Sequence, residues 1–195
     1  MQRVHLFRHG QTDWNQLGRF QGQSDIELNA KGREQARDLL PYFRGHPVQT
    51  FLSSDLSRAE ETARILADEL QLELQTEARL REIHFGEAEG LTSAEIQGRW
   101  GTQAMQAFYS VEPEADDFRF PGGESKLEAM NRALLGIEEF LQRTGHAAIG
   151  VACHGGIIRR VLKELAPRAS RPERIHNGDV FELVHSPSGW SWQFE

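Results

Sequence analysis

The sequence predicts an α/β fold, a three-layer α/β/α sandwich in which helices cover both faces of a mostly parallel sheet. Short apolar runs typical of buried strands alternate with longer segments whose apolar residues recur at helical spacing. Such alternation is typical of parallel sheets that are buried on both faces. The chain has 195 residues with no internal repeat and no linker-like stretch, so a single domain over 1–195 is expected.

Five strands are expected. The runs at 4–7, 50–54 and 147–153 each end in a polar sequence, as buried strands do where they lead into a loop. The runs at 180–185 and 190–194, joined by a Ser-Pro-Ser-Gly turn, predict a hairpin that adds an antiparallel edge to the sheet.

Helices are expected between and after these strands. Ser57 to Glu60 and Ser125 to Glu128 have the capping-box spacing that opens a helix. The apolar faces are predicted to consist of Ala36, Leu39, Leu40 and Phe43; Ala59, Ala63, Leu66 and Leu70; Leu127, Met130, Leu134, Ile137 and Leu141; and Ile158, Val161, Leu162 and Leu165. Residues 86–124 break the pattern. A capping box at Thr92 to Glu95 followed by an acidic loop predicts a lid-like excursion there.

The composition excludes several kinds of partner. With 22 basic and 29 acidic residues the net charge is −7, and no basic run is present, which disfavours nucleic acid. No segment approaches the roughly 20 apolar residues that span a membrane, and the first ten residues lack a signal-peptide core. A single cysteine, Cys153, allows no internal disulfide, so a reduced, cytoplasmic protein with a small-molecule partner is expected, as a monomer or a homodimer.

Three predicted strands end in similar chemistry. Arg8, His9 and Gly10 follow the first, Ser53 to Arg58 follow the second, and His154 begins the loop after the third. The carboxyl ends of parallel strands meet at one edge of a doubly wound sheet, beside helix N-termini whose free N–H groups favour anions. Two imidazoles and two guanidiniums at this edge predict a site for an anion such as phosphate. Arg58 is expected either to pair with Glu61 or Asp55 or to reach the ligand.

Six motifs occur in order along the chain. They are LFRHGQTDWN at 6–15, GRFQG at 18–22 with LNAKG at 28–32, SSDLSRAEET at 53–62, LREIHFG at 80–86 with EG at 89–90, PGGES at 121–125 and HGG at 154–156. This set resembles the histidine phosphatase superfamily, in its phosphoglycerate-mutase-like branch. The resemblance implies a phosphoglycerate-mutase-like sandwich and phosphoryl-transfer chemistry.

The resemblance also implies catalytic roles for five residues. His9 would be the nucleophile and carry the phosphoryl group as a phosphohistidine. Arg8, Arg58 and His154 would clamp the phosphate oxygens. Glu82 would protonate the leaving oxygen and later activate water, a role that requires a protonated carboxyl group in the first step. The implied activity is that of a histidine acid-type phosphatase that requires no metal and no cofactor.

Further positions match the family's phosphate or substrate pocket. They are Asn15, Gln21, Gly22 and Gly155. His84, two residues after Glu82, is expected either to act directly or to serve as a partner for Glu82 or the sheet edge. The lid aromatics Trp100, Phe108, Tyr109, Phe118 and Phe120 are expected to wall the pocket or to pack in the core.

The choice between phosphatase and mutase depends on the lid. Mutases of this family resemble one another in an enlarged segment between Glu82 and His154 that carries extra basic residues. Here the segment is short, and within the lid only Arg99 and Arg119 oppose a larger set of acidic residues. That balance disfavours a doubly anionic sugar acid and favours hydrolysis of a phosphomonoester. The pattern resembles α-ribazole phosphatases, which act on α-ribazole 5'-phosphate, and broad-specificity phosphatases, without choosing between them.

Four alternatives remain open. Two keep the site, namely phosphoglycerate mutase activity and a non-catalytic relative that only binds a phospholigand. Cys153 and Arg159 have the Cys-x5-Arg spacing of cysteine-dependent phosphatases, a reading that leaves His9 without a role. A metal hydrolase would use His9, Glu82, His84 and His154, although their spacing matches no helical metal motif.

Overall fold

The sheet lies at the centre of the molecule. The computed structural model describes residues 1–110, 112–165, 172 and 174–192. In that part of the chain the strands follow the order β3-β2-β4-β1-β5-β6. Their bounds are β1 Gln2–Arg8, β2 Phe51–Ser53, β3 Leu74–Thr76, β4 Ala148–Cys153, β5 Val180–Ser186 and β6 Gly189–Trp192. The first four strands pair in parallel, and the β5–β6 hairpin pairs antiparallel to β1, so the mostly parallel sheet with an antiparallel edge is confirmed.

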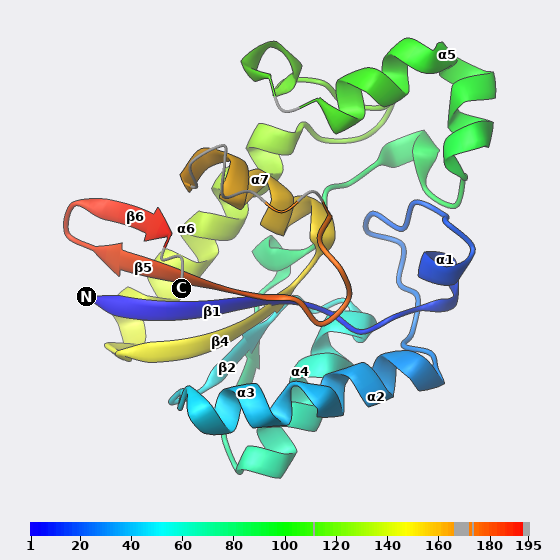
Figure 1. Cartoon of the computed structure of the whole chain (residues 1–195). Helices are drawn as coiled ribbons and strands as arrows, with labels where there is room; N and C mark the ends of the chain where they lie inside the picture. The colour runs from blue at the N-terminus through cyan, green and yellow to red at the C-terminus, as the bar shows by residue number, and fades with distance from the viewer. Residues whose placement is uncertain (111, 166–171, 173, 193–195) are drawn as a thin grey trace.

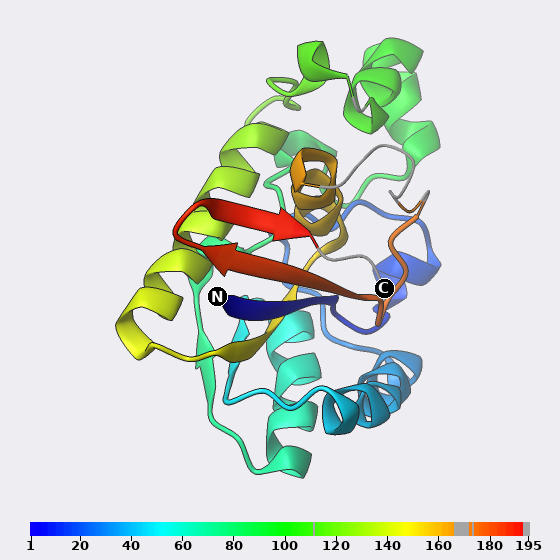
Figure 2. The same ribbon diagram turned by 60° about the vertical axis from the view of Figure 1, so that its left-hand side comes forward.

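Helices cover both faces of this sheet (Figures 1 and 2). On one face lie α2 (Ala30–Asp38), α3 (Leu40–Gly45) and α4 (Ser57–Leu70), and on the other α6 (Lys126–Thr144) and α7 (Gly155–Leu165). Successive residues of a strand point to opposite faces, so Leu6 belongs to the apolar cluster beneath α6 and α7 while Phe7 belongs to the cluster beneath α2 to α4. The predicted three-layer sandwich is therefore confirmed.

Helix α4 differs from its predicted start. Its N-cap is Leu56, and Ser57 is the first helical residue, so the predicted capping box does not form. Instead the backbone N–H and the hydroxyl of Ser57 both donate to Asp25. The capping boxes at Thr92 and Ser125 are present as predicted.

Two further departures concern short elements. The helical stripe from Ala36 to Phe43 is divided between α2 and α3, because Pro41 lacks the N–H that would continue the first helix. All four residues of the stripe are nevertheless buried. Strand β3 was not predicted, since its three residues are largely exposed and give no apolar signal.

The segment 86–124 extends away from the sheet, beyond α7 in Figure 1. It contains η2 (Gly86–Ala88), α5 (Ser93–Tyr109) and η3 (Pro113–Ala115), and Gly101, at φ 82° and ψ 168°, kinks α5 in its middle. Ile96 and Phe120 are buried against the core below. Two short elements, α1 (Asp13–Gln16) and η1 (Ala78–Leu80), lie in loops on the site side of the sheet. None of the helices described is long and apolar enough to cross a membrane.

Candidate active site

The parallel strands bring the predicted residues to one cavity. Arg8 ends β1, Arg58 lies in the first turn of α4 after β2, and His154 lies between β4 and α7. A cavity of about 200 Å³ opens at this edge. Eight of the predicted site residues line it, namely Arg8, His9, Asn15, Gln21, Gly22, Arg58, Glu82 and Gly155. The ninth, His154, lies behind His9, with ring centroids 5.1 Å apart.

The protonation state of the His9 ring is set by its backbone contact. Nδ1 lies 2.6 Å from the carbonyl oxygen of Gly10. A carbonyl only accepts hydrogen bonds, so Nδ1 carries the proton and Nε2 retains its lone pair. The ring is almost fully buried, and burial, reinforced by the charges of Arg58 and Arg8, lowers its pKa well below the usual 6.5. His9 therefore presents a neutral imidazole at the edge of the cavity.

His154 is buried without any hydrogen-bond partner. Both ring nitrogens lack a partner among the described residues, and the side chain has no exposed surface. Burial and the neighbouring charge of Arg58 lower its pKa well below 6.5, so the ring is neutral and carries one N–H. A buried donor of this kind costs free energy unless another group accepts from it.

The two guanidiniums are held by backbone carbonyls and not by carboxylates. Arg58, fully buried, donates to the carbonyl oxygens of Ser24 and Gly22 at 2.8 and 2.7 Å. Arg8 donates to the carbonyl of Ile175 at 2.6 Å. The Nε atom of each is buried and has no hydrogen-bond partner among the residues that the structure describes. Burial lowers the pKa of Arg58 to about 10 and also lowers that of Arg8, so both stay charged at neutral pH.

Neither carboxylate expected to pair with Arg58 does so. The carboxylate of Glu61 accepts two hydrogen bonds from the guanidinium of Arg33, and the carboxylate of Asp55 accepts from Nε and Nη2 of Arg81. The pairing alternative is therefore wrong, and Arg58 lines the cavity; its contact with a ligand stays a prediction.

Glu82 lies at the N-terminus of α7. Its carboxylate accepts from the N–H groups of Gly156 at 2.9 Å, Ile83 at 3.0 Å and Ile157 at 3.2 Å. Gly156 is required here, because a Cβ at that position would come within 2.5 Å of Glu82 Oε1. The three donors fix the carboxylate with its oxygens as acceptors at the wall of the cavity.

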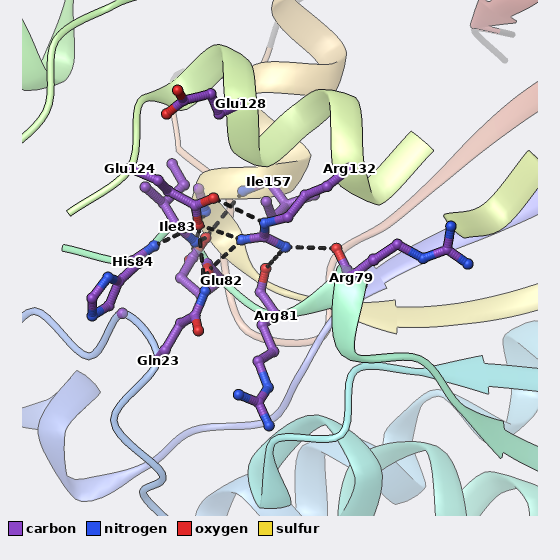
Figure 3. A network of polar contacts seen from close by, with 12 residues as sticks. Gln23, Arg79, Arg81, Glu82, Ile83, His84, Glu124, Glu128, Arg132 and Ile157 are labelled. Atoms are coloured by element: carbon purple, nitrogen blue, oxygen red, sulfur yellow. Dashed lines mark hydrogen bonds and ion pairs between the residues drawn. The ribbon is translucent and has the colours of Figure 1, made fainter. Parts of the chain in front are cut away.

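Arg132 holds the loop that carries Glu82 (Figure 3). Its guanidinium, on α6, donates to the carbonyl oxygens of Arg79, Arg81 and Glu82 at 2.6 to 2.8 Å. It also binds the carboxylate of Glu124, which accepts in turn from the backbone N–H of His84. Residues 79–84 are thus fixed by one arginine and one glutamate from outside the loop.

The loop after the first motif is organised by two polar residues. Thr12 caps α1, because its hydroxyl oxygen accepts from the backbone N–H of Asn15 and its own backbone N–H donates to Asn15 Oδ1. The hydroxyl of Thr12 also donates to Gln21 Oε1. Glu89 accepts from the N–H groups of Gln23, Ser24 and Phe85. These contacts place Asn15, Gln21 and Gly22 on the cavity wall.

The predicted contribution of helix N-termini is wrong in one respect. The free N–H groups at the starts of α4 and α7 were expected to face the bound anion. The Ser57 N–H is instead taken by Asp25, and those of Gly156 and Ile157 are taken by Glu82. The helix starts therefore hold the protein's own carboxylates.

His84 and Cys153 lie outside the cavity. The His84 ring is 3.7 Å from the Glu89 carboxylate and does not contact Glu82. Cys153 is fully buried in the core, where burial raises the pKa of its thiol, the opposite of what a thiolate nucleophile needs. Among the described residues, no three His, Cys, Asp or Glu side chains are grouped to hold a metal ion.

Several cavity residues escaped prediction. Arg19, Lys126 and Arg159 also line the cavity. All three lie outside the segment 86–124, from whose basic and acidic residues the charge of the pocket was predicted. Glu82 is the one acidic side chain among the described residues that line the cavity. Arg159 follows Gly155 by four positions and Gly156 by three in α7, and that helical spacing could have indicated that all three lie on the same face. Of the lid aromatics, Phe108 and Tyr109 line the cavity, whereas Trp100, Phe118 and Phe120 pack with the core.

Comparison with known proteins identifies the family. The family model of the histidine phosphatase superfamily (branch 1) matches residues 4–194. The chain belongs to this superfamily.

Two relatives of this histidine phosphatase are similar over most of their length. Phosphoglycerate mutase-like protein 4 of Arabidopsis thaliana is 35% identical, over 90% of this chain and 76% of the relative. The solved structure of a mycobacterial glucosyl-3-phosphoglycerate phosphatase, in complex with VO3, superposes with a TM-score of 0.86 and is 29% identical, covering 99% of this chain and 98% of that one. The neighbours thus include both mutase-like and phosphatase names.

A third likeness concerns the fold alone. The α-ribazole phosphatase of Shigella flexneri superposes with a TM-score of 0.77 at 23% identity, covering 98% of this chain and 94% of that one. The histidine phosphatase described here shares its architecture.

Proposed function

We propose that this protein is a phosphomonoesterase that hydrolyses a small phosphorylated metabolite through a phosphohistidine intermediate on His9. The observation that carries the proposal is the state of the His9 ring. Its Nδ1–H is bound to the Gly10 carbonyl, so the lone pair on Nε2 is available to attack phosphorus. Arg8, Arg58 and His154 surround it with charged or N–H donors that have no carboxylate partner in the described part of the chain.

In the first step Nε2 of His9 bonds to phosphorus while the bond to the ester oxygen breaks. Arg8, Arg58 and the N–H of His154 stabilise the negative charge on the equatorial oxygens. Glu82 gives its proton to the leaving oxygen, which departs as the alcohol.

In the second step water attacks the phosphohistidine. Ionised Glu82 takes a proton from that water, the phosphorus–nitrogen bond breaks, and inorganic phosphate leaves with His9 neutral again. The arrangement seen in the structure, in which Glu82 only accepts hydrogen bonds, matches the base that this step requires. The mechanism uses no metal and no cofactor.

The boundaries of the enzyme are part of the proposal. We propose one catalytic domain over residues 1–195, in which the segment 86–124 acts as the lid. Phe108 and Tyr109 support this role, since they come from that segment and line the cavity. A reducing, cytoplasmic location is also proposed, and the buried free thiol of Cys153 supports it.

The test is a screen of the purified protein against phosphorylated metabolites. The panel should contain α-ribazole 5'-phosphate, 3-phosphoglycerate and glucosyl-3-phosphoglycerate, with phosphate release and mutase products measured separately. We expect phosphate release that persists in the presence of a chelator. Transfer to 2-phosphoglycerate without net hydrolysis would support the mutase alternative instead, and absence of any turnover would support a phospholigand-binding protein.

A further inference from the structure

A second cavity adjoins the phosphate-binding one. It has a volume of about 470 Å³ and shares Arg8, Tyr109, Arg159 and Ile175 with the first cavity. Its remaining described lining residues are Arg174 and His176. The shared residues place the second cavity next to the first, on the side of Arg8 and Tyr109.

The charges along this path are almost all positive. Arg8, Arg159 and Arg174 line the second cavity, and none of the described residues that line it is acidic. The guanidinium of Arg159 lies over the Tyr109 ring, 5.8 Å from its centroid, and has no carboxylate partner in the described chain. Arg8 lines both cavities, and its Nε is buried without a partner. Arginine forks of this kind suit carboxylate and phosphate oxygens.

The positive field extends to the first cavity as well. Lys126 is nearly buried, and its ammonium donates to the carbonyl oxygens of Ala107, Phe108 and Ser110 at the end of α5. Burial, with the charges of Lys163, Arg160 and Arg159, lowers its pKa to about 8 against the opposing effect of Asp116. If one phosphate group contacts Arg8 and Arg58, neither Arg159 nor Arg174 has a carboxylate partner among the described residues that line the two cavities, apart from Glu82 on the far wall of the first.

We propose that Arg159 and Arg174 form a second anion subsite, which selects phosphomonoesters whose leaving group carries a carboxylate or a further phosphoryl group. The proposal rests on the phosphatase function proposed above and names the substrate class for that site. The proposal also revises the expectation that a doubly anionic substrate is disfavoured, which was based on the charges of the lid. The cations proposed to bind the second anion lie outside the lid, Arg159 in α7 and Arg174 before β5.

The kinetic test uses a matched pair of substrates, glycerol 3-phosphate and 3-phosphoglycerate, which differ in a hydroxymethyl or a carboxylate group. We expect kcat/KM to be about tenfold or more higher for 3-phosphoglycerate, mainly through KM, as one charge-assisted hydrogen bond can provide. R159Q, and more fully R159Q with R174Q, should remove this preference, so that the ratio of kcat/KM between the two substrates falls to about one. R99Q is the matched control, because Arg99 pairs with Glu87 on the lid and lines neither cavity. A preference absent from the wild type, or intact in the double variant, would overturn the subsite.

A binding test separates this proposal from the proposed hydrolysis. Calorimetry should show that 3-phosphonopropionate binds about tenfold more tightly than propylphosphonate, and that R159Q abolishes the difference. Propane-1,3-bisphosphonate in place of 3-phosphonopropionate distinguishes a second phosphoryl group from a carboxylate. If the binding difference is found in a protein that hydrolyses nothing, the subsite stands and the phosphatase proposal fails. Equal binding of the first two phosphonates overturns the subsite whatever the activity.

Discussion

The two walls of the cavity are built in opposite ways. One wall is the clamp, defined here as Arg8, Arg58 and His154, in which buried nitrogen atoms lack partners. The other is the acid loop, residues 79–84, in which the Glu82 carboxylate receives three N–H bonds and Arg132 ties down three carbonyls. Nitrogen atoms of the clamp have no partner among the described residues, whereas the Glu82 carboxylate and the carbonyl oxygens of the acid loop are paired within the chain.

This difference separates the residues that serve binding from those that serve folding. A buried polar group without a partner costs about 1–3 kcal/mol, so each clamp residue is a burden on stability that an anion would relieve. The bonds of the acid loop have the reverse effect, since they stabilise the fold and fix one side chain. Substitutions in the clamp and in the acid loop should therefore differ in which property they change, activity or stability, as well as in the size of the change.

The largest effect is expected at the nucleophile between the two walls. H9A should lower kcat/KM by at least about 10⁴-fold, because no other group can form the covalent intermediate. The measurement is phosphate release from the best substrate of the panel. C153A serves as the control and should retain activity, since the thiol is buried in the core. An inactive, folded C153A beside an active H9A would overturn the assignment.

The next largest effect is expected in the clamp. R58Q should lower kcat/KM by about 10² to 10³-fold, because it removes a donor that stabilises charge in the transition state. R64Q is a matched control on the same helix, where Arg64 pairs with Glu60 at the surface. Unchanged kinetics in R58Q, with its fold intact by circular dichroism, would remove Arg58 from the clamp.

The effect of removing the proposed proton donor, Glu82, should depend on the leaving group of the substrate. E82Q is expected to lower kcat by about 10²-fold on alkyl phosphates and far less on 4-nitrophenyl phosphate, whose leaving group needs no proton. E87Q, which changes an exposed glutamate on η2, is the control. Equal losses of kcat on alkyl phosphates and on 4-nitrophenyl phosphate would assign the proton transfer to another group.

A smaller effect on activity, with a larger one on stability, is expected at Arg132. R132Q frees the carbonyls of the acid loop and should cost about 2–4 kcal/mol in the free energy of unfolding. Activity should fall about tenfold, with the same dependence on leaving group as in E82Q, because Arg132 acts by positioning Glu82. R143Q, on the same helix α6, should change neither quantity by much. A loss of activity in R132Q that is equal for all leaving groups would indicate a merely structural role.

The smallest effect concerns the dependence of stability on pH. His154 has a pKa well below 6.5 when folded and an ordinary pKa when unfolded, so the unfolded state binds more protons below pH 6.5. Stability is thus fully present above pH 6.5 and is lost as the pH falls below it, by up to about 1.4 kcal/mol per pH unit for this group. Denaturation at pH 7.5 and 5.5 should show a smaller difference in H154Q than in the wild type. An equal difference in both proteins would contradict the burial of a neutral ring.

The sequence predicted the clamp better than the acid loop, for a physical reason. Arg8, Arg58 and His154 follow strands, and strand periodicity with parallel topology is enough to bring strand ends together. The position of Glu82 depends on Arg132 and Glu124, which are remote in the sequence and leave no local pattern (Figure 3). Arg159 and Lys126 lie outside the segment 86–124, so the charges of that segment do not indicate them.

The fold shows the same division. The strands of the central sheet and the capping boxes at Thr92 and Ser125 were predictable, because periodicity and capping are local signals. The box at Ser57 failed because Asp25, from a distant loop, bonds the first turn of α4 instead. Strand β3 is too short and too exposed to show a periodic pattern.

The most direct test of phosphoryl transfer to His9 is to trap the intermediate. E82Q should be mixed with the best substrate and quenched in alkali, where phosphohistidine survives, and the digested protein should be analysed by mass spectrometry. The mechanism predicts one phosphoryl group on the peptide that contains His9, and none in H9A. Phosphate release by the wild type with no label on His9, or with a label on Cys153 or His154, would contradict it.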